Sequence, residues 1–372
     1  MRYFFSSGEA SGELSAVLLA ETIRGFDPDA QFEGIGSQRM RDAGFRVWRD
    51  HAGWASMGPL AAIPRIPKLL ATMWRTASHI VETHPDLVIL VDFGAFNLRL
   101  AKELRTRRHY TAPILDVFPP ATWLDNEPRA REVSAYAVPL TAFAHQYEFY
   151  KKHQLPIVFF GHPLASQYRT RPARPAPRSD GGMVALLPGS RGGELKYHLP
   201  ALLAAFELLK GRRPKLQGVF GAATDKGEAR IRAAIERAGV RDLTIARGVA
   251  GAIAQADAAW VSSGTAVLET TLMGVPAIAL YVIAPVLVRH ARRVYSGKYI
   301  TLPNLVLERE IVPEFLQDDA TPENLANAMD ALLRDPARQY DAFAELRERL
   351  GPPDALELCG KFCVALAKAG VV

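Results

Sequence analysis

Residues 3–13, YFFSSGEASGE, run from a short apolar segment into a turn with two glycines, and a helical pattern follows at Ala16 to Arg24. The same order recurs further along the first half, where Leu87 to Asp92 precedes the helical pattern of Leu98 to Arg105. Such alternation is typical of parallel βαβ units, in which each helix returns the chain to the same end of the sheet. The first half is therefore predicted to be a doubly wound α/β sheet.

The second half repeats this arrangement after a break in the pattern. Residues 169–178 hold three prolines and four arginines without apolar periodicity, as in a stiff exposed linker. Apolar segments resume at Met183 to Leu187 and helical patterns at Leu199 to Lys210. We expect a first domain at 1–168, a linker at 169–180, a second domain at 181–345, and a helical segment at 346–372 that crosses back to the first domain. Two Rossmann-like domains facing across a cleft would bind ligands at the carboxyl ends of their strands.

The composition is that of a folded globular protein, with 49% hydrophobic and 23% charged residues among 372. The apolar runs fall short of the roughly 20 residues that span a bilayer, and the start lacks a signal-peptide pattern, so we expect a cytoplasmic location.

Cys359 and Cys363 are spaced to lie on one helix face and are predicted to be buried thiols. The formal charge of +6 favours an anionic partner. Nucleotide phosphate and a phospholipid surface fit better than nucleic acid, because the basic residues are spread through the chain.

Two loops of the predicted second domain suit a nucleotide. In residues 187–194, LPGSRGGE, Arg191 lies among glycines ahead of a helix, and arginine pairs bidentately with phosphate oxygens. The loop is not a P-loop, since the Gly-Lys-Ser/Thr ending is missing. In residues 262–269, SSGTAVLE, hydroxyls and amides of Ser263, Gly264 and Thr265 would face phosphate, and Glu269 would accept ribose hydroxyls. A simple helix cap remains an alternative for the second loop.

In the first half, Asp92 follows the apolar strand of residues 87–91 and precedes a helix. A carboxylate there could act as a general base or could cap the helix, and both interpretations remain open. The glycine turn at residues 7–13 could hold an anionic or polyhydroxylated ligand or be an ordinary β-to-α turn. His162 is interpreted as structural. No spacing of His, Cys and carboxylates predicts a metal site, and no Gly-x-Ser-x-Gly motif predicts a hydrolase.

Six short motifs occur in an order and spacing that extend over almost the whole chain. They are residues 8–13 (GEASGE), 34–36 (GIG) with Arg39 and Met40, 160–162 (FGH), 186–191 (LLPGSR) with Glu194, 263–266 (SGTA) with Glu269, and 302–305 (LPNL). Together they resemble the lipid-A-disaccharide synthase family. That resemblance implies an inverting GT-B glycosyltransferase that moves 2,3-diacylglucosamine from UDP to 2,3-diacylglucosamine 1-phosphate, without a cofactor or metal.

The resemblance also implies roles for individual residues. Asp92 would be the general base, and Glu9 and Ser11 would face the reacting sugars. The residues expected around the UDP-sugar are Gly12, Arg191, Glu194, Ser263, Gly264, Thr265, Glu269 and Asn304. A segment suited to acyl chains at the inner face of the cytoplasmic membrane holds Met57, Leu60, Ile63, Arg65, Lys68 and Trp74. A core helix with basic edges explains that segment equally well.

The departures from the family pattern lie mainly in the first half. The second acid of the family's Asp-x-Pro-Asp-Phe-Asn segment is Ala95 here, and the acid expected in the first loop is Glu13 rather than aspartate. The family's Ser-Pro-x-x-Trp-Ala-Trp segment reads PPATWLD at 119–125, with Leu124 and Asp125, and the acid expected after Gly-His is replaced around Ser166. These changes keep open a GT-B enzyme with a different glycolipid acceptor. A UDP-sugar 2-epimerase is a second alternative, because it shares the two-domain architecture and the nucleotide loops. A non-enzymatic nucleotide-sugar sensor or scaffold is a third possibility. The sequence does not predict the oligomeric state.

Overall fold

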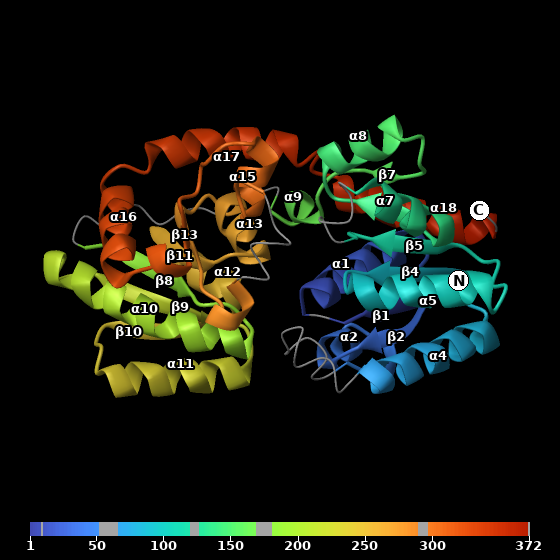
Figure 1. The fold of residues 1–372 in the computed structure, drawn as a ribbon, viewed down its shortest axis with the longest axis horizontal. Helices are drawn as coiled ribbons and strands as arrows, with labels where there is room; N and C mark the ends of the chain where they lie inside the picture. The colour runs from blue at the N-terminus through green and yellow to red at the C-terminus, as the bar shows by residue number, and fades with distance from the viewer. Residues whose placement is uncertain (9, 52–65, 120–125, 169–180, 289–296, 371–372) are drawn as a thin grey trace. The chain divides into compact units, whose positions relative to one another are not determined.

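The computed structural model describes residues 1–8, 10–51, 66–119, 126–168, 181–288 and 297–370. The chain divides into two compact units. Unit 1 is Met1–Gln167 together with Leu350–Val372, and unit 2 is Tyr168–Arg349. Each unit is a parallel sheet covered by helices on both faces (Figure 1). No helix in the described ranges has the length and apolar character needed to cross a membrane.

Unit 1 contains a seven-stranded sheet in the order β3-β2-β1-β4-β5-β6-β7. Its strands are β1 (Arg2–Ser7), β2 (Gln31–Gly36), β3 (Arg46–Asp50), β4 (Leu87–Val91), β5 (Ile114–Val117), β6 (Val138–Thr141) and β7 (Val158–Phe159). Its helices are α1 (Ala10–Phe26), α2 (Gln38–Asp42), α4 (Ile66–Thr83), α5 (Gly94–Thr106), α7 (Glu127–Tyr136), α8 (Ala144–Lys152), α9 (Pro163–Gln167) and α18 (Ala355–Ala369).

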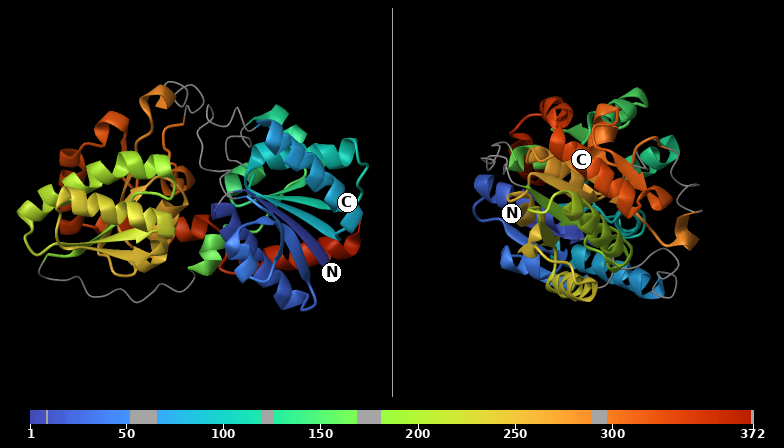
Figure 2. Two further views of the ribbon diagram at one scale, coloured as in Figure 1. Left: turned by 90° about the horizontal axis from the view of Figure 1, so that it is seen from below. Right: turned by 90° about the vertical axis from the view of Figure 1, so that its left-hand side faces the viewer.

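The apolar strands of unit 1 alternate between two cores. On β4, Leu87, Ile89 and Val91 pack toward α1 and α18, and Val88 and Leu90 pack toward α4 and α5. Successive side chains of a strand point to opposite faces, so a strand buried on both sides must be apolar throughout. The helix α18 lies along α1 in the left view of Figure 2, and it brings the buried thiols Cys359 and Cys363 into this core, as the sequence predicts.

Unit 2 contains a six-stranded sheet in the order β10-β9-β8-β11-β12-β13. Its strands are β8 (Met183–Leu187), β9 (Gln217–Ala222), β10 (Leu243–Arg247), β11 (Ala258–Ser262), β12 (Ala277–Tyr281) and β13 (Glu314–Leu316). Its helices are α10 (Gly192–Arg212), α11 (Asp225–Ala238), α12 (Gly248–Ile253), α13 (Thr265–Leu272), α15 (Leu302–Leu307), the 3-10 helix η2 (Gln317–Asp319), α16 (Pro322–Arg334) and α17 (Ala337–Arg349).

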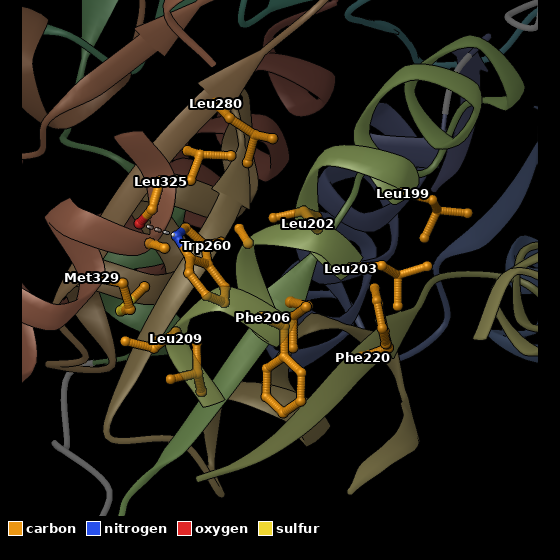
Figure 3. Packing of buried hydrophobic residues seen from close by; sticks show 14 of the residues in the cluster. Leu199, Leu202, Leu203, Phe206, Leu209, Phe220, Trp260, Leu280, Leu325 and Met329 are labelled. Atoms are coloured by element: carbon orange, nitrogen blue, oxygen red, sulfur yellow. Dashed lines mark hydrogen bonds between the residues drawn. The ribbon is translucent and has the colours of Figure 1, made fainter. Parts of the chain in front are cut away.

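One face of the unit 2 sheet packs against α10, α11 and α16. Trp260 on β11 is fully buried there among leucines of α10, and its indole Nε1 donates a hydrogen bond of 3.1 Å to the carbonyl of Leu325 on α16 (Figure 3). A buried indole N–H needs such a partner, because an unsatisfied donor in a core is costly. Trp260 therefore fixes α16 against the sheet through packing and through one specific bond.

Both sheets have the same relative strand order. In each unit the strand that comes first in the sequence lies inside the sheet, and the second and third extend to one side of it. The fourth to sixth extend to the other side, where unit 1 adds a seventh strand, β7. The order reverses between β1 and β4 in unit 1 and between β8 and β11 in unit 2. Ligands of doubly wound sheets bind at the carboxyl ends of the strands beside such a switch point. The loops after β1, β4, β8 and β11 are therefore the places to search for chemistry.

Candidate active site

The turn after β4 holds Asp92 in an unusual backbone conformation. Asp92 and Phe93 have φ values of 54° and 47°, in the left-handed region that residues other than glycine seldom adopt. The Asp92 amide donates to the carbonyl of Val117 at 3.2 Å, and its Oδ1 accepts from the Phe93 amide at 2.8 Å. The carboxylate thus helps to form the turn before α5, but the N-cap residue of that helix is Phe93, so Asp92 does not occupy the capping position. Its role as a base remains a prediction.

Asn97, to which the sequence analysis gave no role, holds this turn to the end of β1. Its side chain is fully buried. Its Nδ2 donates to the Asp92 carbonyl at 2.7 Å, and its Oδ1 accepts from the Ser6 hydroxyl at 2.6 Å. These bonds join the ends of β1 and β4, so they fix the position from which the Asp92 side chain projects.

The two glycines of the first turn permit a close approach between that turn and Asp92. A Cβ atom at Gly12 would lie 2.9 Å from Ser7 Oγ and 3.2 Å from Asp92 Cβ, and one at Gly8 would overlap the Phe93 ring. The absence of side chains therefore has a packing reason, and the contact of Gly12 with UDP remains a prediction. Glu9 lies outside the described residues, and the Ser11 side chain is likewise not described.

Glu13 lies near the start of α1 and forms a buried pair with a histidine that the sequence analysis missed. Its carboxylate accepts from the amide and the hydroxyl of Ser37, and His51 Nε2 lies 3.3 Å from Glu13 Oε1. Burial alone would raise the pKa of Glu13, but the hydrogen bonds from His51 and Ser37 outweigh it and the pKa is lowered. Burial would lower the pKa of His51, but Glu13 raises it. Both shifts favour a charged pair.

A second acid lies on the strand next to β4. Asp116 of β5 is 2% exposed, and its Oδ1 has no hydrogen-bond partner among the described residues. Burial, and then the charge of Asp92, raise the pKa of Asp116 to about 7. No motif marks this residue, because a single aspartate within an apolar strand has no distinctive spacing.

In unit 2 the loop after β8 is closed by Glu194. This carboxylate accepts from the amides of Ser190 and Arg191 at 2.9 and 3.1 Å, and Arg191 Nη1 lies 3.2 Å from Glu194 Oε1. Gly189 has a φ of 99°, and a Cβ there would lie 2.9 Å from the Glu194 Cβ. Glu194 is therefore placed as a helix cap, whereas the Arg191 side chain, 49% exposed, lies at the start of α10. Their contacts with UDP remain predictions.

His198 of α10 joins two strand ends and was not singled out by its sequence. It is fully buried, its Nδ1 lies 2.8 Å from the Pro188 carbonyl, and its Nε2 accepts from the Val282 amide at 2.9 Å. A carbonyl can only accept, so Nδ1 carries the proton in the neutral ring. Burial lowers the pKa of His198, which agrees with this neutral form. The ring therefore connects the loop after β8 with the end of β12.

The loop after β11 leads into α13 with Gly264 and Thr265 exposed. The Ser263 amide donates to the Leu280 carbonyl at 3.0 Å. One turn into α13, Glu269 accepts a hydrogen bond from the hydroxyl of Tyr168, a residue that sequence reasoning missed. Burial raises the pKa of Glu269, and the Tyr168 bond opposes this shift. The predicted phosphate and ribose contacts of this loop remain predictions.

Asn304 is placed differently from the other predicted UDP ligands. It is fully buried, its Oδ1 accepts from the amides of Ile311 and Val312, and its Nδ2 donates to the Val312 carbonyl and to Glu314 Oε1 at 2.7 and 2.8 Å. The same Glu314 carboxylate accepts from the amide of Thr301, the N-cap of α15. The Asn304 side chain thus holds α15 against β13 in this structure, and contact with UDP remains a prediction.

The predicted membrane residues are described only in part. Lys68 and Trp74 lie on α4, where both are exposed together with Ile66. The other predicted residues of that segment, Met57, Leu60, Ile63 and Arg65, lie outside the described residues, as do Leu124 and Asp125 of the departing segment. Within the described ranges, no three His, Cys, Asp or Glu side chains gather as a potential metal site.

Comparison with known proteins agrees with the motifs. A family model described as lipid-A-disaccharide synthetase matches residues 3–351. A lipid-A-disaccharide synthase of Pseudomonas aeruginosa is 32% identical over 362 residues, which cover 94% of each chain.

Among solved structures, the fold is similar to the UDP-GlcNAc 2-epimerase of Neisseria meningitidis, with a TM-score of 0.66 and 10% identity over 98% of this chain and 100% of that one. It is also similar to Acinetobacter baumannii MurG, with a TM-score of 0.59 and 17% identity over 98% and 99%. At such low identity these two likenesses show a shared GT-B-like fold and nothing about substrates. The match with the family, over nearly the whole chain, decides against the epimerase alternative. The chain belongs to the lipid-A-disaccharide synthase family, whose members are glycosyltransferases.

Proposed function

We propose that this protein transfers 2,3-diacylglucosamine from UDP-2,3-diacylglucosamine to 2,3-diacylglucosamine 1-phosphate and forms lipid A disaccharide 1-phosphate and UDP. The observation that carries the proposal is the family match over residues 3–351. The fold supports it, because each unit has a doubly wound sheet with polar loops at its switch point.

We assign the general base to Asp92. In a single displacement the carboxylate takes the proton of the acceptor hydroxyl, the hydroxyl oxygen bonds to the anomeric carbon of the donor, and the bond from that carbon to UDP breaks with inversion. Asp92 is held for this task by the bonds of Asn97 to its backbone and by the packing of Gly12 against its Cβ. A base held in a fixed position retains its alignment with the acceptor through the reaction.

We assign the leaving UDP to unit 2. The exposed Arg191 guanidinium lies at the N-terminus of a 21-residue helix, where cationic and amide donors stabilise the charge that develops on the diphosphate. The start of α13, with Ser263, Gly264 and Thr265, would hold phosphate oxygens, and Glu269 would accept the ribose hydroxyls. Glu194 and Asn304 form structural bonds that shape these loops, and their predicted contacts with UDP would have to be made alongside those bonds.

The lipid chains of both substrates require contact with a membrane surface. The exposed Ile66 and Trp74 share α4 with the exposed Lys68 and Arg75. Apolar side chains with cationic neighbours on one helix are suited to an anionic bilayer, because the first insert and the second pair with headgroups. We therefore propose peripheral binding at the inner face of the cytoplasmic membrane. Co-sedimentation with vesicles containing anionic lipid should weaken in Trp74→Ala, and unchanged sedimentation would contradict the assignment of α4.

The direct test is product analysis by mass spectrometry after the protein is mixed with both substrates in mild detergent. The proposal expects a disaccharide 1-phosphate and one UDP for each linkage formed. Binding of the UDP-sugar without that product would contradict the assigned acceptor.

A different glycolipid acceptor is a second candidate, and Ala95 favours it. This residue is exposed at the start of α5, three positions after Asp92, where the family pattern has an acid. Loss of a negative charge at such a position changes which acceptor groups are tolerated beside the base. A panel of glycolipid acceptors at equal concentration tests this. Equal preference for the usual acceptor in the wild type and in Ala95→Asp would count against the second candidate.

A further inference from the structure

Asp116 is an acid that the proposed mechanism does not use, although it lies next to the residues that the mechanism needs. It is on β5, where it pairs with Leu90 of β4 in the strand register, two positions before Asp92. The next residue of β5, Val117, accepts the hydrogen bond from the Asp92 amide. The backbones that carry the two acids are therefore joined directly, and neither can shift without the other.

Asp116 interacts electrostatically with Tyr150 of α8, and both are buried side chains whose bonding is incomplete. Asp116 Oδ1 and the Tyr150 hydroxyl lack hydrogen-bond partners among the described residues, and so does Gln146 Nε2, which is also on α8. Gln146 is held on its other side, where its Oε1 accepts from the Thr141 hydroxyl of β6. Buried polar atoms are almost always bonded, and exceptions concentrate at functional positions. An isolated buried carboxylate would be strongly disfavoured, so this carboxyl is set to hold a proton.

The charged and titratable groups around Asp116 are few. The strand pairs place the uncharged residues Leu90 and Pro139 on either side of it. Its electrostatic partners among the described residues are Asp92, after β4, and Tyr150, on α8. Burial raises the pKa of Tyr150 far above neutrality, so this phenol stays protonated. The variable charge nearest to Asp116 is therefore that of Asp92.

We propose that Asp116 is a positioning residue for the glycosyl transfer, which acts through Asp92 by holding or releasing a proton on the adjacent strand. This inference rests on the proposed function, since it takes Asp92 as the base. When Asp116 is protonated, Asp92 carries the single negative charge of the pair. When Asp116 loses its proton to solvent, the second negative charge increases the affinity of Asp92 for the proton of the acceptor hydroxyl.

The consequence is a second inflection in the pH dependence of turnover. Loss of the Asp116 proton makes Asp92 a stronger base while Asp92 remains ionised. A second negative charge on the neighbouring strand should speed proton transfer to Asp92, and we expect the rate to rise by roughly threefold. The rise should appear in kcat and leave KM unchanged, because Asp116 is too deeply buried to touch substrate.

The first experiment measures the coupling without any turnover. Carbon-13 NMR of protein labelled at the aspartate carboxyl carbons follows the titration of Asp116 in the wild type and in Asp92→Asn. Asparagine suits the left-handed conformation of residue 92 and can accept the Phe93 amide through its Oδ1, so this variant should fold. We expect the Asp116 midpoint to fall when the charge at 92 is removed. An unchanged midpoint would overturn the proposal.

The second experiment compares the pH profiles of kcat in the wild type, Asp116→Asn and Glu103→Gln. Glu103 lies on α5 of the same unit and is paired with Arg107 and Arg108, so its variant controls for the exchange of a carboxyl for an amide. The threefold rise should vanish in Asp116→Asn and persist in Glu103→Gln. A wild type without the rise, or an Asp116→Asn variant that keeps it, would overturn the proposal. Absence of turnover in the wild type would instead overturn the proposed function, and the NMR titration would still decide whether the acids are coupled.

Discussion

The two switch points have the same strand order but use their acidic residues in opposite ways. In unit 2, Glu194 and Glu314 accept hydrogen bonds from backbone amides at the starts of α10 and α15. Their carboxylates therefore stabilise the loops. In unit 1, Asp92 also accepts from a backbone amide, but Asp116 on the neighbouring strand has an oxygen without a hydrogen-bond partner in the described part of the chain. Strand order determines where a site can form, and the bonding of its acids determines whether they remain available for proton transfer.

We expect this difference to separate catalysis, in unit 1, from nucleotide binding, in unit 2. If it is correct, changes at the unit 1 switch point should lower kcat with little effect on nucleotide affinity. Changes at the unit 2 switch point should weaken nucleotide binding.

The largest expected effect is that of Asp92→Asn. Loss of a general base lowers kcat by roughly 10²- to 10⁴-fold. The affinity for UDP, measured by calorimetry, should stay within about twofold of the wild type if unit 2 alone holds the nucleotide. A parallel loss of UDP affinity would show that the two switch points do not act separately, and unchanged kcat would remove Asp92 from the base role.

The next largest effect concerns stability in unit 1. The pKa of Asp116 is about 7 in the folded protein because of burial and the charge of Asp92, against 3.8 for a free aspartate. As pH rises from 4 to 8, the unfolded chain loses this proton before the folded chain does, so the wild type loses stability. Asp116→Asn lacks this titration. Its free energy of unfolding relative to the wild type should therefore rise by on the order of 3 kcal/mol between pH 4 and pH 8, measured by urea denaturation. A difference that is independent of pH would show that Asp116 ionises normally.

The apolar pattern of the sequence is sufficient to predict the fold class. Runs such as Leu87 to Val91 and Met183 to Leu187 are buried on both faces and can only be central strands. The strands β2, β3, β6 and β13 were not predicted. β3, with the sequence RVWRD, is an edge strand, so it has a neighbouring strand on one side only and is less buried than a central strand. β2 contains two glycines and a glutamate. Edge position and close backbone contacts replace apolar composition in those strands.

The site residues that could be predicted lie in loops, where glycines and charged residues form a recognisable motif. The site residues inside helices and strands could not be predicted. Arg191 and Asp92 follow strands and stand out in the sequence. Asn97, Asp116 and His198 each lie inside a helix or strand, and their roles depend on partners in other elements. The separation in sequence is 91 residues between Asn97 and Ser6 and 84 between His198 and Val282. No local pattern encodes such a partner. Asn304 stood out only through a motif, and its side chain is occupied by structural bonds.

In unit 2, Arg191→Ala should weaken UDP binding. Loss of a charge-assisted bond to phosphate costs about 1.5 to 3 kcal/mol, which corresponds to roughly ten- to hundredfold in the dissociation constant. Lys196→Ala is the matched control, because Lys196 is exposed on the same helix and its substitution also removes one positive charge. Equal losses in the two variants would mean that net charge attracts UDP and that Arg191 has no specific contact.

The smallest expected effect is that of His198→Asn, which can keep the bond to the Pro188 carbonyl and loses the bond from the Val282 amide. We expect a loss of about 1 to 2 kcal/mol in the free energy of unfolding at pH 8. Burial lowers the pKa of His198 below 6.5, so the unfolded wild type takes up a proton as pH falls through 6.5 while the folded protein does not. The wild type therefore loses stability as pH falls, whereas the variant does not. The difference in the free energy of unfolding between the two proteins should become smaller toward pH 5.

Because His198 connects the loop after β8 to β12, the variant should also bind UDP about threefold more weakly, while kcat at saturating donor stays unchanged. A fall in kcat without a change in UDP affinity would reverse the roles assigned to the two units.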